Sequence, residues 1–230
     1  MNQSTQISQV AVAESSFFTK VYQWMAGGLV VTALASVMTI SYTPFLTALM
    51  RQPFLLLGLI IAELGLVIWL SARIMTMPLR QAMTMFLAYS ALSGITLSPI
   101  FLIYTGASIA STFAITAGTF MIFSVYGYTT KKDLTSMGSL AVMGLIGFLI
   151  ASVVNFFLKS PALYWLITYG LIAVFLGLIA YDTQKLKQIR MQLDPSGEQS
   201  SRIAIMGALT LYLDFINLFI LLLRIFGRRR

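Results

Sequence analysis

The chain has 230 residues, of which 58% are hydrophobic and only 10% are charged, and its formal net charge is +8. A soluble globular domain carries roughly one half apolar and one quarter charged residues, so this composition predicts a polytopic membrane protein. The sequence contains no cysteine and no histidine, which excludes disulfides, thiolate and imidazole catalysis, and the usual zinc, copper and haem sites. Any ion chemistry must therefore use oxygen ligands, and nucleic-acid binding is not expected, because Lys and Arg cluster between apolar runs.

The chain is predicted to begin with a tail and to continue as seven membrane helices. Residues 1–16 are rich in Ser, Gln and Thr and lack the regions of a signal peptide, so we expect a disordered polar tail before a single transmembrane domain at 17–230. Seven apolar runs follow, each near the roughly 20 residues that a bilayer requires. They do not alternate as barrel strands do, so the fold is predicted to be all-α. The runs cover residues 22–40, 54–71, 81–103, 107–126, 137–158, 162–181 and 204–226.

The cations predict an orientation. With a cytoplasmic N-terminus, the outer gaps hold only Arg51 and Lys159, whereas the inner gaps hold Lys20, Arg73, Arg80, Lys131, Lys132, Lys185, Lys187, Arg190 and Arg202. The end of the chain argues the other way, because a last run that crosses fully leaves Arg224 and residues 228–230 outside. Either that run crosses despite its charges, or it is re-entrant and returns to the cytoplasm.

Small residues recur at helical spacing in two of the runs. They occur at Gly144 and Gly147, and they form a stripe in the fourth run. Such stripes let helix backbones approach closely, so the pattern predicts packing and no site. The stripe of the fourth run consists of Ser108, Ser111, Ala114 and Gly118.

Three acidic residues fall within or at the rim of the apolar runs: Glu63, Asp182 and Asp214. A carboxylate inside an apolar segment costs several kcal/mol in lipid, so each must face protein, water or an ion. The sixth and seventh runs are antiparallel neighbours, so Asp182 and Asp214 can meet. Two carboxylates in contact cannot both ionise at low cost, so a shared proton would clamp the helices. Loss of that proton would produce repulsion or a site for a hard divalent cation, which makes the pair a candidate pH switch.

Other polar residues accompany these acids. Asp214 shares a helix stripe that predicts the lining of a polar path, although a hydrogen-bonded patch that holds helices together would look the same. Glu63 is a candidate second ion or proton station. Arg73, ten residues later, could neutralise an inward-facing carboxylate, or its side chain could simply extend to the membrane interface. The stripe comprises Gly207, Thr210, Asp214, Asn217, Leu221 and Arg224.

Four segments resemble the bacterial branch of the Bax inhibitor (transmembrane Bax inhibitor motif) family, most closely its inner-membrane members from Gram-negative bacteria. They are residues 17–25, residues 108–134, the motif Ala180-Tyr181-Asp182-Thr183-Gln184-Lys185-Leu186 and residues 207–219. The resemblance covers the chain from about Phe17 to its end. It implies seven helices, with the last central between two groups of three, and a pH-sensitive calcium leak.

The resemblance also implies roles for particular residues. Asp182 and Asp214 match the paired aspartates that act in the family as pH sensor and ion site. Arg73 is the nearest match to an arginine at the inner end of the second helix, and Glu63 lies where family members often carry an acidic residue. The basic residues 228–230 depart from the family pattern.

The leading hypothesis is a non-enzymatic, proton-gated calcium pathway in the bacterial inner membrane, with a cytoplasmic N-terminus. Its partners would be the lipid bilayer, calcium ions bound by Asp182 and Asp214, and protons, with no further cofactor. One alternative is a membrane-embedded regulator of proteases or stress responses, whose protein partner would bind the 182–203 loop. Another is an intramembrane aspartyl protease, with the two carboxylates around a water. For that enzyme, Leu211-Tyr212-Leu213 stands where a glycine-rich motif is expected.

Overall fold

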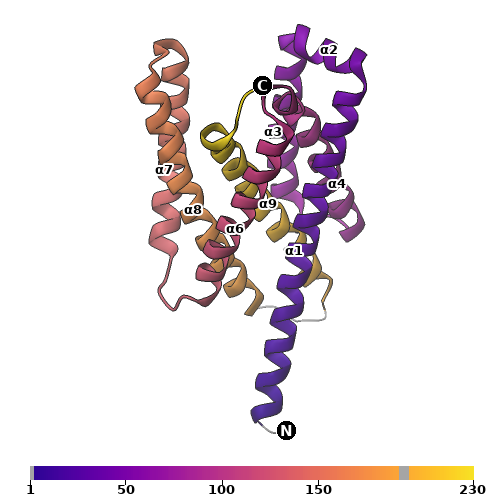
Figure 1. The fold of residues 1–230 in the computed structure, drawn as a ribbon. Helices are drawn as coiled ribbons and strands as arrows, with labels where there is room; N and C mark the ends of the chain where they lie inside the picture. Colours follow the sequence, from indigo (N-terminus) through magenta and orange to yellow (C-terminus); the bar gives the residue numbers. More distant parts are fainter. Residues whose placement is uncertain (1–2, 192–196) are drawn as a thin grey trace. The chain divides into compact units, whose positions relative to one another are not determined.

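The computed structural model describes residues 3–191 and 197–230. Within these ranges all regular structure is helical, apart from an isolated bridge between Tyr104 and Arg229 (Figure 1). The helices in chain order are α1 (Gln3–Ser41), α2 (Thr43–Arg51), α3 (Pro53–Arg73), α4 (Leu79–Leu97), α5 (Ile100–Ile103), α6 (Gly106–Thr129), α7 (Thr135–Leu158), α8 (Pro161–Met191) and α9 (Glu198–Phe226).

Seven segments of the described chain are long and apolar enough to cross a membrane, and they coincide with the seven predicted runs. The prediction of an all-α, polytopic membrane protein is therefore confirmed. α4 and α5 together make the third of these segments, and Pro99 stands at the break between them. α1 begins at Gln3, within the segment that the sequence predicts to be a polar tail. Of the predicted 182–203 loop, residues 182–191 and 198–203 are helical, and residues 192–196 lie outside the described chain.

The chain divides into two compact units, and each has its own packing. Unit 1 comprises residues 1–105, 189–212 and 229–230. Within it, α4 packs against both α1 and α3. The backbones of α1 and α4 approach so closely at Gly94 that a Cβ atom there would lie 2.3 Å from the carbonyl oxygen of Thr32. The Thr32 hydroxyl completes this contact by lying 2.7 Å from the Tyr212 hydroxyl and by donating to the Ser90 carbonyl.

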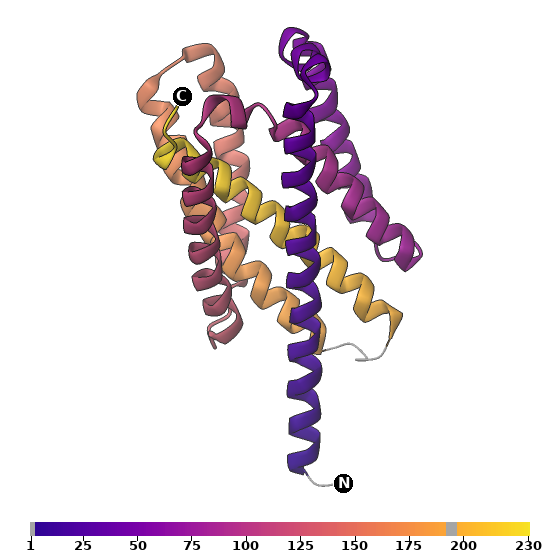
Figure 2. The same ribbon diagram turned by 45° about the vertical axis from the view of Figure 1, so that its right-hand side comes forward.

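Unit 2 comprises residues 106–188 and 213–228. In it α7 and α8 run antiparallel beside each other, as both ribbon views show (Figure 1 and Figure 2). Of the predicted small-residue stripe on α6, Ser108 is buried, but the prediction is wrong for Ser111, Ala114 and Gly118, which are exposed. The face that α6 buries repeats every fourth residue and carries hydroxyl groups, so polar contacts rather than small size define it. It consists of Ser108, Thr112, Thr116, Phe120 and Ser124.

α9 is the most buried of the membrane-crossing helices. In its most apolar stretch 67% of the residues are buried, against at most 33% in any other such helix of the described chain. Its first half belongs to unit 1 and its second half to unit 2. This burial explains how Asp214 comes to lie away from lipid.

α9 also decides between the two alternatives for the end of the chain. It runs without interruption for 29 residues, about 43 Å at 1.5 Å per residue, so the re-entrant alternative is wrong. Beyond it the Arg228 amide donates to the Ser108 hydroxyl at 2.8 Å, and the Arg230 amide donates to the Ile103 carbonyl at 2.9 Å. The chain end therefore lies at the α5–α6 connection.

A labelling experiment checks this placement, and the absence of native cysteine makes it simple. Single variants Arg230→Cys and Gly106→Cys are expected to react with a membrane-impermeant maleimide from the same side of the membrane. Lys131→Cys, beyond the other end of the 24-residue α6, should react only from the opposite side. Labelling of Arg230→Cys together with Lys131→Cys would contradict the placement.

Candidate functional site

The motif at residues 180–184 is held on α8 by close contacts with α6 and α7. A Cβ atom at Gly127 of α6 would lie 2.1 Å from the carbonyl oxygen of Ala180, so the two backbones touch where only glycine fits. On α7, a Cβ atom at Gly138 would lie 2.5 Å from the ring of Tyr181. The two residues before Asp182 are thus fixed by their neighbours, and α8 has little freedom to turn at this point.

The two residues that follow Asp182 tie α8 to polar groups. The Thr183 hydroxyl lies 3.0 Å from the Ser124 hydroxyl and donates to the Ile179 carbonyl. The Gln184 side chain donates to the Lys132 carbonyl and accepts from the Leu134 amide, both at 2.8 Å. The α6–α7 connection is therefore fastened to α8 two residues after Asp182. Sequence reasoning missed Thr183 and Gln184, although two polar residues directly after an aspartate in an apolar helix were a usable signal.

Gln184→Ala is expected to release the α6–α7 connection. The variant leaves the buried Leu134 amide without its partner, which costs about 1–3 kcal/mol, and it also removes the hydrogen bond to the Lys132 carbonyl. Hydrogen exchange at the amides of residues 130–135 should become faster in the variant. Gln188→Ala is the matched control, because Gln188 is exposed one turn later on the same helix. Equal exchange in the two variants would contradict the fastening role.

The carboxyl groups of Asp182 and Asp214 lie within hydrogen-bonding reach of each other. Asp182 is half-buried, and Asp214 is only 5% exposed. Ionised carboxylates only accept hydrogen bonds, so this contact requires a proton or a cation between them. The Oδ2 atom of Asp214 is buried and has no hydrogen-bond partner, which leaves an acceptor free inside the fold.

The surroundings of the pair combine hydroxyl groups with aromatic rings. Phe215 directly follows Asp214 in the sequence. The rings of Phe113 and Phe120 of α6 pack on the Phe215 ring, with centroid distances of 5.2 Å and 5.7 Å. On the buried face of α6, the Ser124 hydroxyl meets that of Thr183, the residue after Asp182. Lys185 is close enough to act electrostatically on Asp182. Among the described residues, no group of three or more acidic side chains is placed to hold a metal ion.

The other predicted site residues of α9 do not join the pair. The Asn217 amide donates to the Leu213 carbonyl of its own helix at 2.8 Å. Arg224 lies ten residues beyond Asp214, about 15 Å along the helix, where its guanidinium is 5.9 Å from the ring centroid of Tyr164. The predicted polar stripe therefore breaks up into separate contacts.

Glu63 and Arg73 lie in unit 1, whereas the aspartate pair lies in unit 2. The Glu63 carboxylate accepts hydrogen bonds from the Ser93 hydroxyl and, at 2.8 Å, from the Thr96 hydroxyl of α4. Arg73 is exposed at the end of α3, and no ion pair joins it to Glu63 in this part of the described chain. Glu63 therefore links α3 to α4, and the structure does not bring Arg73 to it as an ion-pair partner.

Comparison with known proteins places the chain in a family. The family described as "Inhibitor of apoptosis-promoting Bax1" matches residues 14–230. The inner membrane protein YbhL of Escherichia coli is 50% identical over 228 residues, covering 99% of this chain and 97% of the relative. An uncharacterized protein of Borreliella burgdorferi is 42% identical, covering 98% and 97% of the two chains, and one of Rickettsia prowazekii is 45% identical, covering 93% and 90%. With seven membrane-crossing helices and these relatives, the chain belongs to the Bax inhibitor family.

Proposed function

We propose that this protein is a passive, pH-sensitive pathway for calcium in the bacterial inner membrane. The observation that carries the proposal is the contact between the carboxyl groups of Asp182 and Asp214, on two helices that are long and apolar enough to cross a membrane. Structural carboxylates in membranes usually pair with cations or hydrogen-bond donors. Two carboxyl groups in contact can stabilise the fold only when a proton or a cation lies between them.

The proton accounts for gating. One shared proton turns two repelling groups into a donor and an acceptor, which holds α8 and α9 together. When the proton leaves, the two carboxylates repel each other, and this repulsion favours separation of α8 from α9 at this point. Because the rest of the motif is fastened to α6 and α7 through Gly127, Thr183 and Gln184, the movable partner is the α9 side of the contact. The pathway is therefore closed at low pH and opens as the pH rises.

The oxygen chemistry fits calcium as the permeant ion. Calcium binds six to eight oxygen ligands, with carboxylates, carbonyls, hydroxyls and water all acceptable. Two carboxylates supply only part of this set, so a passing ion would keep much of its water and would not be trapped. The buried hydroxyl face of α6, with Thr112, Thr116 and Ser124, offers further oxygens in the same unit.

Orientation and location belong to the same proposal. A cytoplasmic N-terminus leaves most Lys and Arg residues of the gaps on the inner side, and seven crossings then bring the chain end and the α5–α6 connection to the outer side. The name of the relative YbhL as an inner membrane protein supports the same membrane for this chain.

Flux through reconstituted protein tests the function. Liposomes that contain the protein, a calcium gradient and an internal calcium dye should release calcium down the gradient, and the rate should rise between about pH 5 and pH 8. Protein-free liposomes provide the background. No flux above this background at any pH, or a rate independent of pH, would refute the proposed pathway.

A further inference from the structure

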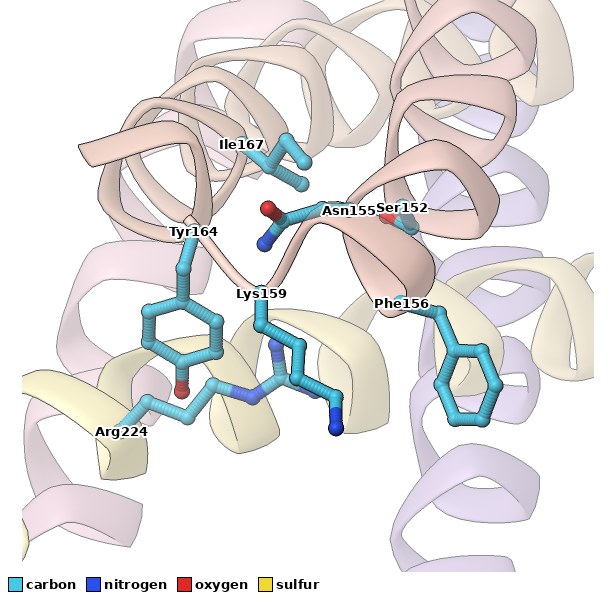
Figure 3. A pocket seen from close by; sticks show the side chains of 7 residues that line it. All are labelled: Ser152, Asn155, Phe156, Lys159, Tyr164, Ile167 and Arg224. Carbon is cyan, nitrogen blue, oxygen red and sulfur yellow. The ribbon is translucent and has the colours of Figure 1, made fainter. Parts of the chain in front are cut away.

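A pocket lies in unit 2 where α7 turns into α8 and where α9 ends. Its volume is about 460 Å³, and residues of all three helices line it (Figure 3). This place is about 15 Å from Asp214 along α9, so it is separate from the aspartate pair. The residues that decide its chemistry are Asn155, Phe156, Lys159, Tyr164 and Arg224.

Two cations without counter-charges face this pocket. Figure 3 shows the side chain of Lys159 from the α7–α8 connection and that of Arg224 from α9, both among the residues that line the pocket. No carboxylate lines the pocket. Within residues 3–191 and 197–230, neither cation has an acidic side chain within ion-pair distance. The pocket is therefore electropositive, and a bound anion would provide the missing charge.

The positions of both cations are fixed by local structure. Lys159 ends α7 with φ 51°, a left-handed conformation that residues with side chains rarely adopt. Asn155 stabilises this turn twice, because its backbone carbonyl accepts from the Lys159 amide at 2.8 Å and its side chain accepts from the Ser160 amide at 3.0 Å. The Arg224 guanidinium lies against the ring of Tyr164. The two charges are thus presented by a defined turn and a defined stacking contact.

The surface beside the pocket is apolar and unusually aromatic. Phe156 and Phe157 are each 76% exposed, and Trp165 and Tyr169 are exposed as well. On helices that cross a membrane, such side chains contact lipid tails and the interfacial region. A suitable ligand would place an anionic group in the electropositive pocket and cover the neighbouring apolar surface with hydrocarbon.

We propose that this pocket binds the phosphate of an anionic phospholipid, with Lys159 and Arg224 as its two cationic contacts. Guanidinium and ammonium groups both form charge-assisted hydrogen bonds with phosphate oxygens. An anionic headgroup such as phosphatidylglycerol is favoured over a zwitterionic one, because the pocket has no carboxylate to receive a headgroup ammonium. The proposal does not depend on calcium transport.

Tryptophan quenching measures this binding directly, because Trp165 lies next to Tyr164 in sequence and is 41% exposed. A chain with Trp24→Phe and Trp69→Phe retains Trp165 as its single tryptophan. In mixed vesicles, brominated phosphatidylglycerol should quench it with a relative binding constant roughly tenfold above that of brominated phosphatidylcholine, given the attraction expected of two cations. Lys159→Gln combined with Arg224→Gln should bring this ratio close to one.

Two matched control variants distinguish lipid binding at this pocket from a general effect of the protein's positive charge. Lys20→Gln combined with Arg51→Gln removes the same charge from exposed positions in unit 1 and should keep the preference. Lys159→Arg combined with Arg224→Lys preserves the charges and should also keep it. Equal quenching by the two lipids in the parent chain would overturn the proposal, and so would a preference that survives the Gln pair. Release of the brominated lipid by millimolar inorganic phosphate would also overturn it, because the pocket would then hold a free anion.

Discussion

Asp214→Asn is expected to abolish the pH dependence of calcium release and to leave the pathway closed. The amide of Asn has nearly the shape of a protonated carboxyl group, and it can donate to the Asp182 carboxylate at any pH. The contact between α8 and α9 would then persist without a proton. The parent protein should lose the same contact as the pH rises, because an ionised pair has no donor.

The size of the effect follows from the number of protons. A single shared proton changes the closed-to-open ratio by at most tenfold per pH unit, or about 1.4 kcal/mol. Over the three units between pH 5 and pH 8 the closed-to-open ratio can therefore change by at most about a thousandfold. We expect the parent rate to change by roughly tenfold or more within this limit, whereas the Asp214→Asn rate should stay within about twofold of its value at pH 5. Asp182→Asn should behave in the same way, since the pair titrates as a unit.

Asp133→Asn is the control for these variants. Asp133 lies in the α6–α7 connection, where the hydroxyl and amide of Thr135 donate to its carboxylate and hold its pKa below the usual value. It therefore stays ionised throughout the pH range of the assay, and its loss should leave the pH profile unchanged. A pH profile that survives in Asp214→Asn, or one that disappears in Asp133→Asn, would show that the aspartate pair does not gate the pathway.

The sequence was sufficient for the helices because the membrane imposes a simple rule. Long apolar runs predict spanning helices, and the seven predicted runs match those of the structure. The same rule fails for side-chain direction, since nearly every face of such a helix is apolar. The stripe of Ser111, Ala114 and Gly118 was for this reason assigned to the wrong face of α6, and only contacts between distant segments reveal the buried hydroxyl face.

The site was predicted in part for a related reason. Asp182 and Asp214 stand out because charge is rare in apolar runs, and antiparallel neighbours bring them together. Helical spacing also predicted that Arg224 accompanies Asp214, but spacing gives only a direction around the axis. Arg224 lies ten residues beyond Asp214 along the axis and is therefore beside Tyr164. Helical spacing alone does not indicate this separation of Arg224 from Asp214. The roles of Thr183 and Gln184 depend on α6 and the α6–α7 connection, which lie more than 45 residues away in the chain.

Gly127→Ala is expected to destabilise unit 2 by about 1–3 kcal/mol, the usual cost of inserting a methyl group into a filled interior. The added Cβ atom would lie 2.1 Å from the carbonyl oxygen of Ala180, and a backbone atom in a helix cannot move aside as a side-chain end can. α6 and α8 must therefore separate. The thermal unfolding midpoint in detergent should fall by several degrees relative to the parent protein.

Gly118→Ala is the matched control on the same helix. No atom lies within 4 Å of a Cβ placed there, and alanine favours a helix over glycine by up to about 1 kcal/mol. This variant should be as stable as the parent or slightly more stable. Asp182 follows Ala180 by two residues, so separation of α6 from α8 should also weaken the aspartate contact, and Gly127→Ala should release calcium at a lower pH than the parent. Equal unfolding midpoints for the two alanine variants would contradict the close α6–α8 packing, and an unchanged pH profile in a destabilised Gly127→Ala would separate that packing from gating.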